Sequence, residues 1–336
     1  MRSSVYLSSC RLRAWKHWSA AGMLALGLCQ PVLAQPVGTS PSRSVTEWLT
    51  RMHEASRLRA YTGTLVVSSA STMSASRIWH ICDGTQQMER VETLTGAPRS
   101  TIRHNKDVIT FVPEDKVAWI DKRESLGMFP ELLRAPSNSL PEFYSVGEGT
   151  PERVAGYLAD VVDILPRDNL RFGYRIWSEK KTGLVIKLQT LGEQGAVLEQ
   201  VAFSELYLDA PVRMDKLKRL MNDTRGYEVH RKVLRKTTAE AEGWRLKESV
   251  PGFQPMSCHT PEAGTARGPG TAPMQWVFSD GLASVSLFVE PFDAQRHDVE
   301  GSAVTGATHS LTRRIGAHWL TVLGEVPPAT LKRFAT

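Results

Sequence analysis

A change of hydrophobic period near residue 60 constrains this fold more than any other feature of the sequence. Before it, Ser44 and Glu47 fit a capping box, which predicts the start of a helix. After Arg59 the spacing becomes that of strands, with many β-branched and aromatic residues, so sheets must bury most of the core. The apolar residues that recur at helical spacing before the change are Val45, Trp48, Leu49, Met52, Ala55 and Leu58.

Short strand patterns separated by turn residues run through the first part of the chain. Residues 153–165 could also begin as a helix, but their β-branched content and the stop at Pro166 favour a strand. Neighbouring patterns joined by short turns predict an antiparallel meander. The other predicted strands here are 61–67, 77–81, 108–112, 117–120, 171–177, 184–188 and 196–203.

The segment Leu126–Tyr144 interrupts the strand pattern. It is apolar, but Pro130, Pro136 and Pro141 divide it, so it cannot form one long helix or a central strand. We expect short helical turns or loops lying over a sheet. The same segment is the candidate for a mobile element, and a static plug is the alternative.

Residues 209–225 are charged and lack the strand pattern, which predicts a linker. A second strand-rich block follows, with a flexible loop predicted at Gly264–Pro273 and a closing helical turn at Pro327–Lys332. Its predicted strands are 227–235, 244–248, 275–278, 283–289, 309–314 and 318–323. The expected organisation is a signal peptide at 1–34, a disordered segment at 35–43, an N-terminal domain at 44–208, a linker at 209–225 and a C-terminal domain at 226–336.

The N-terminus has the composition of a secretory signal peptide. A basic region precedes the apolar run Ala20–Leu28, and Val32 and Ala34 are the small residues expected before a cleavage at Gln35. The apolar run is shorter than the roughly 18 residues of a membrane span. We therefore expect an exported, periplasmic protein, with an uncleaved anchor as the alternative.

Export also accounts for most of the positive charge. The formal net charge of the chain is +6, and residues 1–34 contribute four basic groups and no acidic group, so the mature chain keeps about +2. Nucleic-acid binding would need a clustered basic face, which this chain lacks. Cys82 and Cys258 remain after cleavage. An oxidising compartment permits a disulfide between them, and two free thiols are the alternative.

Motifs for catalysis, metal binding and cofactors are missing from the sequence. It contains no nucleophile elbow, no zinc-protease motif, no phosphate-binding loop and no C-x-x-C pair. Ser178–Lys181 matches S-x-x-K but lies in a predicted turn without partner motifs. The histidines are dispersed, and His80 is expected to be a hydrogen-bonded core residue. We expect no enzyme, no cofactor and no metal site.

Aromatic and long apolar residues are abundant in the first block. Most of them should fill a barrel core, and the functional alternative is an apolar groove for an acyl chain or an amphipathic helix. The candidate groove residues are Trp79, Phe111, Trp119, Met128, Phe129, Leu132, Leu133, Phe143, Tyr144 and Trp177.

Several blocks of the chain, in the right order, resemble the MucB/RseB family of periplasmic regulators of the envelope-stress sigma factor. The most specific is Arg171–Trp177, and Phe278–Ala283 is similar in the second block. Thr95 and Ser100–Thr101 depart from the family pattern, and the loop Met256–Pro273 is longer than usual. The other similar blocks are 61–64, 77–80, 89–91, 102–103, 153–156, 165–168, 182–184, 198–200, 285–290 and 324–327.

The resemblance implies a mainly β, α+β fold. Its large N-terminal domain would be an unclosed β-barrel like the lipoprotein carrier LolA, with helices at its mouth, beside a smaller C-terminal β domain. It implies a negative regulator that binds the periplasmic region of a transmembrane, MucA/RseA-like anti-sigma factor and shields it from the site-one protease. Lipopolysaccharide or lipoprotein acyl chains would release the shield. A LolA-type lipid or lipoprotein carrier is the alternative, and a homo-oligomer is left open.

Overall fold

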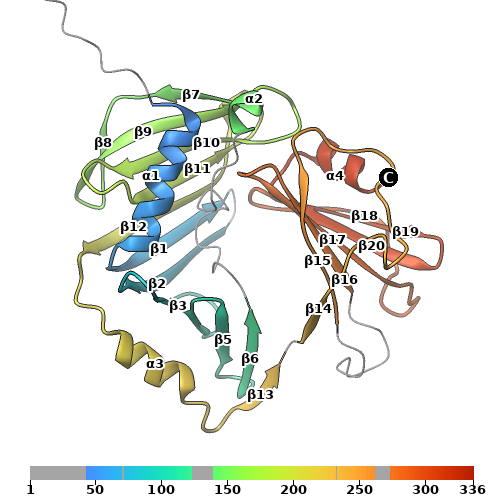
Figure 1. Cartoon of the computed structure of the whole chain (residues 1–336), viewed down its shortest axis with the longest axis horizontal. Coiled ribbons are helices and arrows are strands. Elements are labelled where there is room, and N and C mark those ends of the chain that lie inside the picture. Colours follow the sequence, from blue (N-terminus) through green and yellow to red (C-terminus); the bar gives the residue numbers. More distant parts are fainter. Residues whose placement is uncertain (1–42, 70–71, 123–138, 232, 262–272) are drawn as a thin grey trace, which may run out of the picture. The chain divides into compact units, whose positions relative to one another are not determined.

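Two largely antiparallel sheets and a few helices make up the structure, a computed structural model (Figure 1). It describes residues 43–69, 72–122, 139–231, 233–261 and 273–336. From Arg43 onward these residues belong to one compact unit. The predicted signal peptide, and the segment 35–43 apart from Arg43, lie outside the described residues.

Helix α1 (Val45–Leu58) begins where the capping box predicts. The backbone N–H of Glu47 donates to Ser44 Oγ at 3.2 Å, and the Ser44 N–H donates back to Glu47 Oε2 at 2.7 Å. The reciprocal bonds satisfy two of the free N–H groups of the first turn. The helix packs on the first sheet with the predicted stripe, whose buried members are Val45, Trp48, Leu49, Met52 and Ala55.

The first sheet contains thirteen strands among the described residues, in the order β13-β6-β5-β4-β3-β2-β1-β12-β11-β10-β9-β7, with β8 paired to β9. Its outer strands β13 and β7 are not paired with each other in the part that the structure describes, so the barrel is unclosed. The strands are β1 (Tyr61–Ser69), β2 (Thr72–Cys82), β3 (Gln87–Thr93), β4 (Ser100–His104), β5 (Asp107–Val112), β6 (Val117–Lys122), β7 (Tyr144–Glu148), β8 (Glu152–Val154), β9 (Tyr157–Pro166), β10 (Gly173–Glu179), β11 (Val185–Leu191), β12 (Val197–Leu208) and β13 (Glu228–Arg231).

A short helix and a 3-10 turn interrupt the series of strands, apart from the longer helix α3 described below. Helix α2 (Leu140–Phe143) precedes β7, which agrees with the short helical turns expected at the end of the proline-broken segment. Residues 126–138 of that segment lie outside the described residues. The 3-10 turn η2 (Glu193–Gly195) joins β11 to β12.

Helices α1 and α3 (Met214–Asn222) cover opposite faces of the first sheet. Ile78 of β2 belongs to the core under α1 and pairs in register with Val91 of β3. Met88 lies three residues before Val91 on the same strand, so its side chain points to the other face. It belongs to the core that Leu217 of α3 covers.

The expected linker 209–225 therefore contains a packed helix. Met214, Leu217 and Met221 recur at helical spacing, which the linker interpretation overlooked. Strand β13 then pairs in parallel with β6, so the first sheet continues past residue 226, the expected start of the C-terminal domain. The predicted strand 227–235 is thus divided between the two sheets.

The second sheet contains seven strands among the described residues, in the order β14-β15-β16-β17-β20-β19-β18. Helix α4 (Pro328–Phe334) buries Leu331 and Phe334 against it, which confirms the predicted closing turn. The strands are β14 (Leu234–Lys236), β15 (Gln254–Pro261), β16 (Met274–Ser279), β17 (Ser284–Pro291), β18 (Gly301–Thr305), β19 (Thr308–Ile315) and β20 (His318–Gly324).

The predicted strand Trp244–Glu248 is wrong. These residues form no strand, and Trp244 and Leu246 are half-buried against the core of the second sheet. An alternating pattern can arise in an irregular segment when every second side chain packs on a core. The mainly β fold, with a large unclosed sheet and a smaller C-terminal sheet, is confirmed. None of the described helices is long and apolar enough to cross a membrane.

Candidate functional site at the junction of the two sheets

The predicted groove residues do not form one groove in the described part of the chain. Tyr144 and Trp177 are 1% and 3% exposed in the core under α1, and Phe111 is 7% exposed in the core under α3. These three side chains fill cores, which is the alternative that the sequence left open. The predicted residues Met128, Phe129, Leu132 and Leu133 lie outside the described residues.

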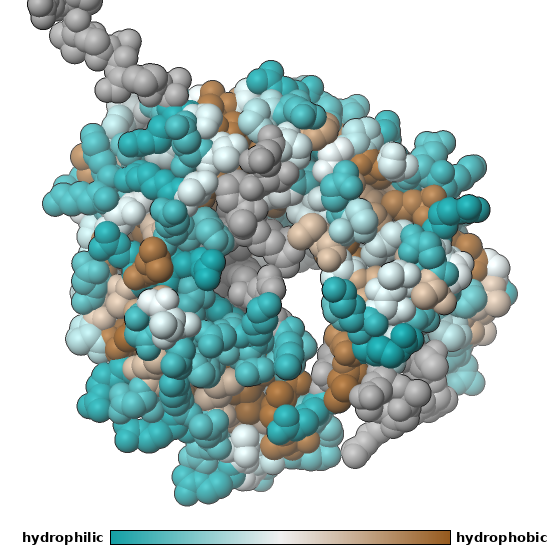
Figure 2. Space-filling model, in the orientation of Figure 1, coloured by the Kyte–Doolittle hydropathy of each residue, from teal (hydrophilic) through white to brown (hydrophobic). Residues whose placement is uncertain are grey.

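Trp79 and Trp119 lie on opposite faces of the first sheet. Trp119 is 49% exposed, lies on the face that α1 covers and stacks on His230 with ring centroids 4.7 Å apart. Trp79 lies on the other face, with the guanidinium of Arg90 at 4.9 Å from its ring centroid. Over the parts of Figure 2 not drawn in grey, apolar residues form small separate patches, so this view shows no broad apolar face.

Phe143, the remaining predicted residue, lies where the two sheets meet, and the hydroxyl of Tyr144 reaches the same place from the core under α1. Tyr144 Oη donates to Asp280 Oδ2 at 2.9 Å, and Arg171 Nε donates to the same oxygen at 2.8 Å. The side chains of Arg171 and Asp280 are both fully buried. Burial, and secondly the Asp280 carboxylate, holds the pKa of Tyr144 well above its usual value, so the hydroxyl stays a donor.

Each nitrogen of the Arg171 side chain that can donate has an acceptor. Nη2 donates to the carbonyl oxygen of Pro251 at 2.6 Å, and Nη1 donates to Asp168 Oδ2. The ring of Phe143 lies against the guanidinium, with its centroid 4.4 Å from Cζ. A buried charge is tolerated only when it is paired and hydrogen-bonded in this way.

The other oxygen of Asp280 shapes the turn between β16 and β17. Oδ1 accepts from the backbone N–H groups of Leu282 at 2.9 Å and Ala283 at 2.8 Å. The turn directs Leu282, 1% exposed, into the core of the first sheet, while Leu170 belongs to the core of the second. Each sheet thus supplies a side chain to the other's core, so we define Tyr144, Arg171 and Asp280 as the junction triad.

A second contact joins the sheets at the turn between β18 and β19. The backbone N–H of Ala307 donates to the Glu199 carboxylate of β12, and burial raises the pKa of that carboxyl. Gly306 has φ +60°, and a Cβ atom there would overlap Glu199 Oε2. Glycine is therefore required at this turn for both its backbone conformation and the close approach.

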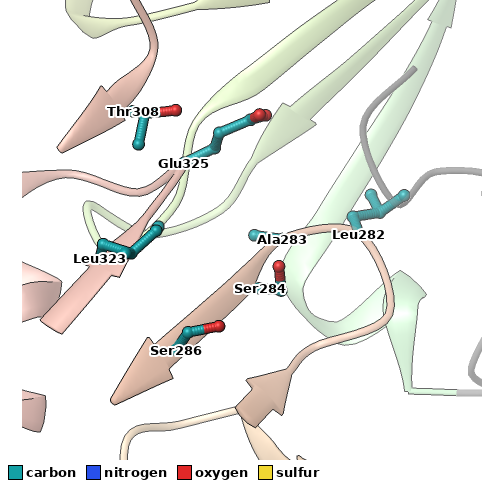
Figure 3. Close-up of a pocket in the computed structure, with 8 residues that line it drawn as sticks. Leu282, Ala283, Ser284, Ser286, Thr308, Leu323 and Glu325 are labelled. Carbon is teal, nitrogen blue, oxygen red and sulfur yellow. The ribbon is translucent and has the colours of Figure 1, made fainter. Parts of the chain in front are cut away.

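A small cavity of about 130 Å³, lined by both polar and apolar residues, opens next to the turn between β16 and β17 (Figure 3). Its size suits a few water molecules, since each occupies about 30 Å³ in the liquid. Pockets that enclose drug-sized ligands measure about 300–1,000 Å³, so this cavity is too small for an acyl chain. Its lining residues are Leu282, Ala283, Ser284, Ser286, Thr308, Leu323, Gly324 and Glu325.

A buried polar row crosses the first sheet on the face that α1 covers. His80 is 2% exposed, places Nδ1 2.7 Å from the carbonyl oxygen of Arg59 and stacks on Tyr61. Burial lowers its pKa, so it is the expected neutral, hydrogen-bonded core histidine. The next strands supply Glu89 and Arg103, whose side chains pair at 3.1 Å.

Metal ligands do not gather in the described residues, where no three His, Cys, Asp or Glu side chains are placed to hold an ion. Cys82 and Cys258 are free thiols in the structure. Burial raises the pKa of the Cys258 thiol, so that thiol is held in its unreactive, protonated form.

Sequence reasoning did not single out Arg171 and Asp280 as site residues. They are 109 residues apart, and only the resemblance blocks contained both. The sequence around them gave no local signal for the pair, because Arg171 stands at the start of the predicted strand 171–177 and Asp280 lies in the turn between β16 and β17. Charged residues in such positions are rarely buried unless they are paired.

Comparisons with known proteins cover both sheets. Residues 44–221 match the model of the MucB/RseB N-terminal domain, and residues 238–336 match that of the MucB/RseB C-terminal domain. The sigma factor AlgU regulatory protein MucB of Pseudomonas aeruginosa is 28% identical over 307 residues, 89% of this chain and 92% of that protein. The sigma-E factor regulatory protein RseB of Haemophilus influenzae is 24% identical over 306 residues, 90% and 93% of the two chains.

Solved structures give the same result. A crystal structure of MucB in complex with MucA(peri) is 26% identical and has a TM-score of 0.63. The similarity covers 87% of this chain and 97% of that one. A crystal structure of MucB, 24% identical with a TM-score of 0.61, has the same fold.

Proposed function

The chain belongs to the MucB/RseB family, and from this premise we propose that it is a periplasmic negative regulator of an envelope-stress sigma factor. It binds the periplasmic region of a transmembrane anti-sigma factor and shields that region from the site-one protease. The observation that carries this proposal is the similarity to MucB in its complex with MucA(peri), which runs through both sheets. Its task is binding rather than catalysis.

The signal-peptide pattern before Gln35 supports a periplasmic location. Regulation there requires two ligands whose binding is mutually unfavourable. If lipopolysaccharide or lipoprotein acyl chains bind a form that cannot hold the anti-sigma region, linkage releases that region. A coupling of about 1–3 kcal/mol changes affinity roughly 5- to 150-fold, so the signal must act near its threshold concentration.

The junction triad is the structural feature that suits such coupling. Tyr144 is the first residue of β7 in the first sheet, and Asp280 lies in a turn of the second sheet. A ligand that separates the two residues therefore affects both sheets. The predicted groove residues Met128, Phe129, Leu132 and Leu133, with the exposed Trp119, remain our proposed contacts for the apolar ligand. The segment Leu126–Tyr144 ends at the triad, which supports its proposed role as the responsive element.

A LolA-type carrier of lipid or lipoprotein is the second candidate. The unclosed sheet with a helix on one face is compatible with it. A carrier works without an anti-sigma factor and hands its cargo onward. It has no need of a second sheet held by buried charges, which favours the regulator.

Protease protection tests the proposal directly. The purified periplasmic region of the anti-sigma factor is incubated with the site-one protease, with or without the mature protein, and cleavage is followed over time. We expect the mature protein to slow cleavage and purified lipopolysaccharide to restore it. Cleavage that the mature protein leaves unchanged, together with transfer of a fluorescent lipid to acceptor vesicles, would instead identify a carrier.

A further inference from the structure

The buried polar row on the first sheet has no part in the proposed function. Its four members stand opposite one another on neighbouring strands, and each is at most 7% exposed. Ionisable side chains are rarely buried so fully, and groups with perturbed ionisation gather where a protein uses them. From β1 to β4 the members of the row are Tyr61, His80, Glu89 and Arg103.

The row holds the C-terminal end of α1. His80 Nδ1 lies 2.7 Å from the carbonyl oxygen of Arg59, the residue that ends the helix. A carbonyl oxygen only accepts, so Nδ1 carries the proton and donates. Gln87 Nε2 donates to the carbonyl oxygen of Arg57 at 3.0 Å, and Gln87 Oε1 accepts from Arg103 Nη1 at 3.5 Å. The row therefore satisfies carbonyl groups that the last turn of a helix leaves free.

The charges of the row balance only while His80 is neutral. Glu89 Oε2 accepts from Nε and Nη2 of Arg103 at 3.3 and 3.1 Å, so the one carboxylate already neutralises the guanidinium. Tyr61 stacks on the His80 ring with centroids 4.9 Å apart, and burial raises the pKa of its hydroxyl, so it carries no charge. On β12 the residue opposite Tyr61 is the apolar Leu208.

Helix α1 brings no further carboxylate to the row. Its two acidic residues, Glu47 and Glu54, are exposed. The Arg59 guanidinium lies 3.7 Å from Asp209, and its side chain is 42% exposed. A protonated His80 would therefore be a buried cation without a carboxylate of its own, which is costly.

We propose that the buried polar row is an acid-sensitive latch for the C-terminal end of α1. When Nε2 of His80 takes up a proton, the imidazolium leaves its buried position and the bond to the Arg59 carbonyl oxygen breaks. The last turn of α1 then separates from the sheet. Glu89 and Arg103 stay paired, because strand pairing holds them together.

Burial lowers the pKa of His80, which agrees with this direction. The stability that the neutral imidazole contributes is fully present above the ordinary histidine pKa of about 6.5. It is lost as the pH falls from there through the lowered pKa of the folded protein. Because one proton is taken up, opening should increase by at most about tenfold per pH unit. This inference goes beyond the proposed function, because the latch requires neither the anti-sigma factor nor a lipid.

Amide hydrogen exchange tests the latch. Exchange of the mature protein is followed by NMR between pH 7 and pH 5 and corrected for the intrinsic pH dependence of exchange. Protection of residues 55–59 should fall at least about threefold. Residues 48–52 should stay protected, because hydrogen bonds from Ser44 lower the pKa of Glu47 and the capping box stays intact.

His80→Gln removes the titrating group but keeps an amide that can donate to the Arg59 carbonyl oxygen. It should abolish the pH dependence of residues 55–59. The matched control is His230→Gln, because His230 also lies on the first sheet and stacks on an aromatic ring, Trp119, at 4.7 Å. The control should lose protection as the unchanged protein does.

Three results would overturn the proposal. One is constant protection of residues 55–59 down to pH 5. Another is an equal loss in residues 48–52, which would mean that the whole helix unfolds. The third is the same loss in His80→Gln as in the unchanged protein, which would assign the acid response to another group.

A readout on the unchanged protein applies if His80→Gln fails to fold. The NMR shifts of the His80 imidazole carbons report its protonation directly. They should change only below the ordinary histidine pKa of about 6.5. A titration of His80 at or above that value would also overturn the proposal.

Discussion

Arg171–Asp280 and Arg103–Glu89 are both buried arginine–carboxylate pairs, but they join different parts of the molecule. Arg103 and Glu89 lie on neighbouring strands of one sheet, where strand pairing already holds them together. Arg171 and Asp280 belong to different sheets and are 109 residues apart. Strand pairing supports the first pair, whereas the second pair itself helps hold two sheets in one arrangement.

The carboxylates also differ in how many donors depend on them. Asp280 accepts from Tyr144 Oη, Arg171 Nε and two backbone N–H groups of its own turn. Glu89 Oε2 accepts from Nε and Nη2 of a single arginine, Arg103. Removal of Asp280 therefore leaves buried donors of both sheets without an acceptor. Removal of Glu89 takes an acceptor from the donors of one side chain.

Asp280→Ala should have the largest effect on stability. It leaves buried donors of Tyr144, Arg171 and the turn without an acceptor, which costs about 3–5 kcal/mol when a buried ion pair is broken. The free energy of unfolding from a urea titration measures this loss. A loss below about 1 kcal/mol would mean that water reaches the junction triad and that the triad does not hold the sheets together.

Glu89→Ala should cost less, about 2–3 kcal/mol, because Arg103 keeps an acceptor in the carbonyl oxygen of Asn105 at 2.8 Å. The same urea titration gives the value. If Glu89→Ala destabilises the protein as much as Asp280→Ala, the contrast between the two pairs is wrong.

Gly306→Ala tests the second contact between the sheets. Gly306 and Gly316 have nearly the same backbone, φ +60° and +58°, but a Cβ at Gly316 meets nothing within 4 Å. Gly316→Ala therefore reports backbone strain alone, about 1 kcal/mol. Gly306→Ala adds the overlap with Glu199 and should lower the melting temperature further. Equal melting temperatures for the two variants would exclude a tight contact at Glu199.

Glu199→Gln should have the smallest effect, and its sign depends on pH. Burial raises the pKa of this carboxyl, so folding favours its protonated form. The stability that the protonated Glu199 carboxyl contributes is fully present below the ordinary carboxyl pKa. It is lost as the pH rises through the raised pKa of the folded protein. The glutamine stays uncharged and can still accept from Ala307, so it should be neutral or slightly stabilising at pH 7. In thermal melts at pH 4 and pH 7, the melting temperature should change less between the two pH values for the variant than for the unchanged protein.

Local patterns predicted much of the fold. The capping box at Ser44 and the stripe of α1 depend on residues within a few positions of one another, and the structure has both. The strands β3 and β4 were not predicted, because Glu89 and Arg103 lower their apolar content, and only the pairing across strands makes that burial acceptable. The charged surface of α3 similarly concealed its buried stripe.

The site was less predictable than the fold. Of the predicted groove residues, Phe143 and Tyr144 meet at the junction, because α2 ends there. Trp177 and Phe111 belong to cores, and composition alone does not separate a core aromatic from a ligand-binding one. The pairing of Arg171 with Asp280 has no local signature, since it depends on how two sheets pack.

The most direct test of this account is the affinity of the mature protein for the periplasmic region of its anti-sigma factor, measured by isothermal titration. Asp280→Asn and Glu89→Gln are compared with the unchanged protein at a temperature where melts show all three to be folded. We predict that the unchanged protein and Glu89→Gln bind alike, and that Asp280→Asn binds at least about tenfold more weakly, a difference of about 1.4 kcal/mol. No binding by the unchanged protein, or equal affinity for all three, would contradict the account.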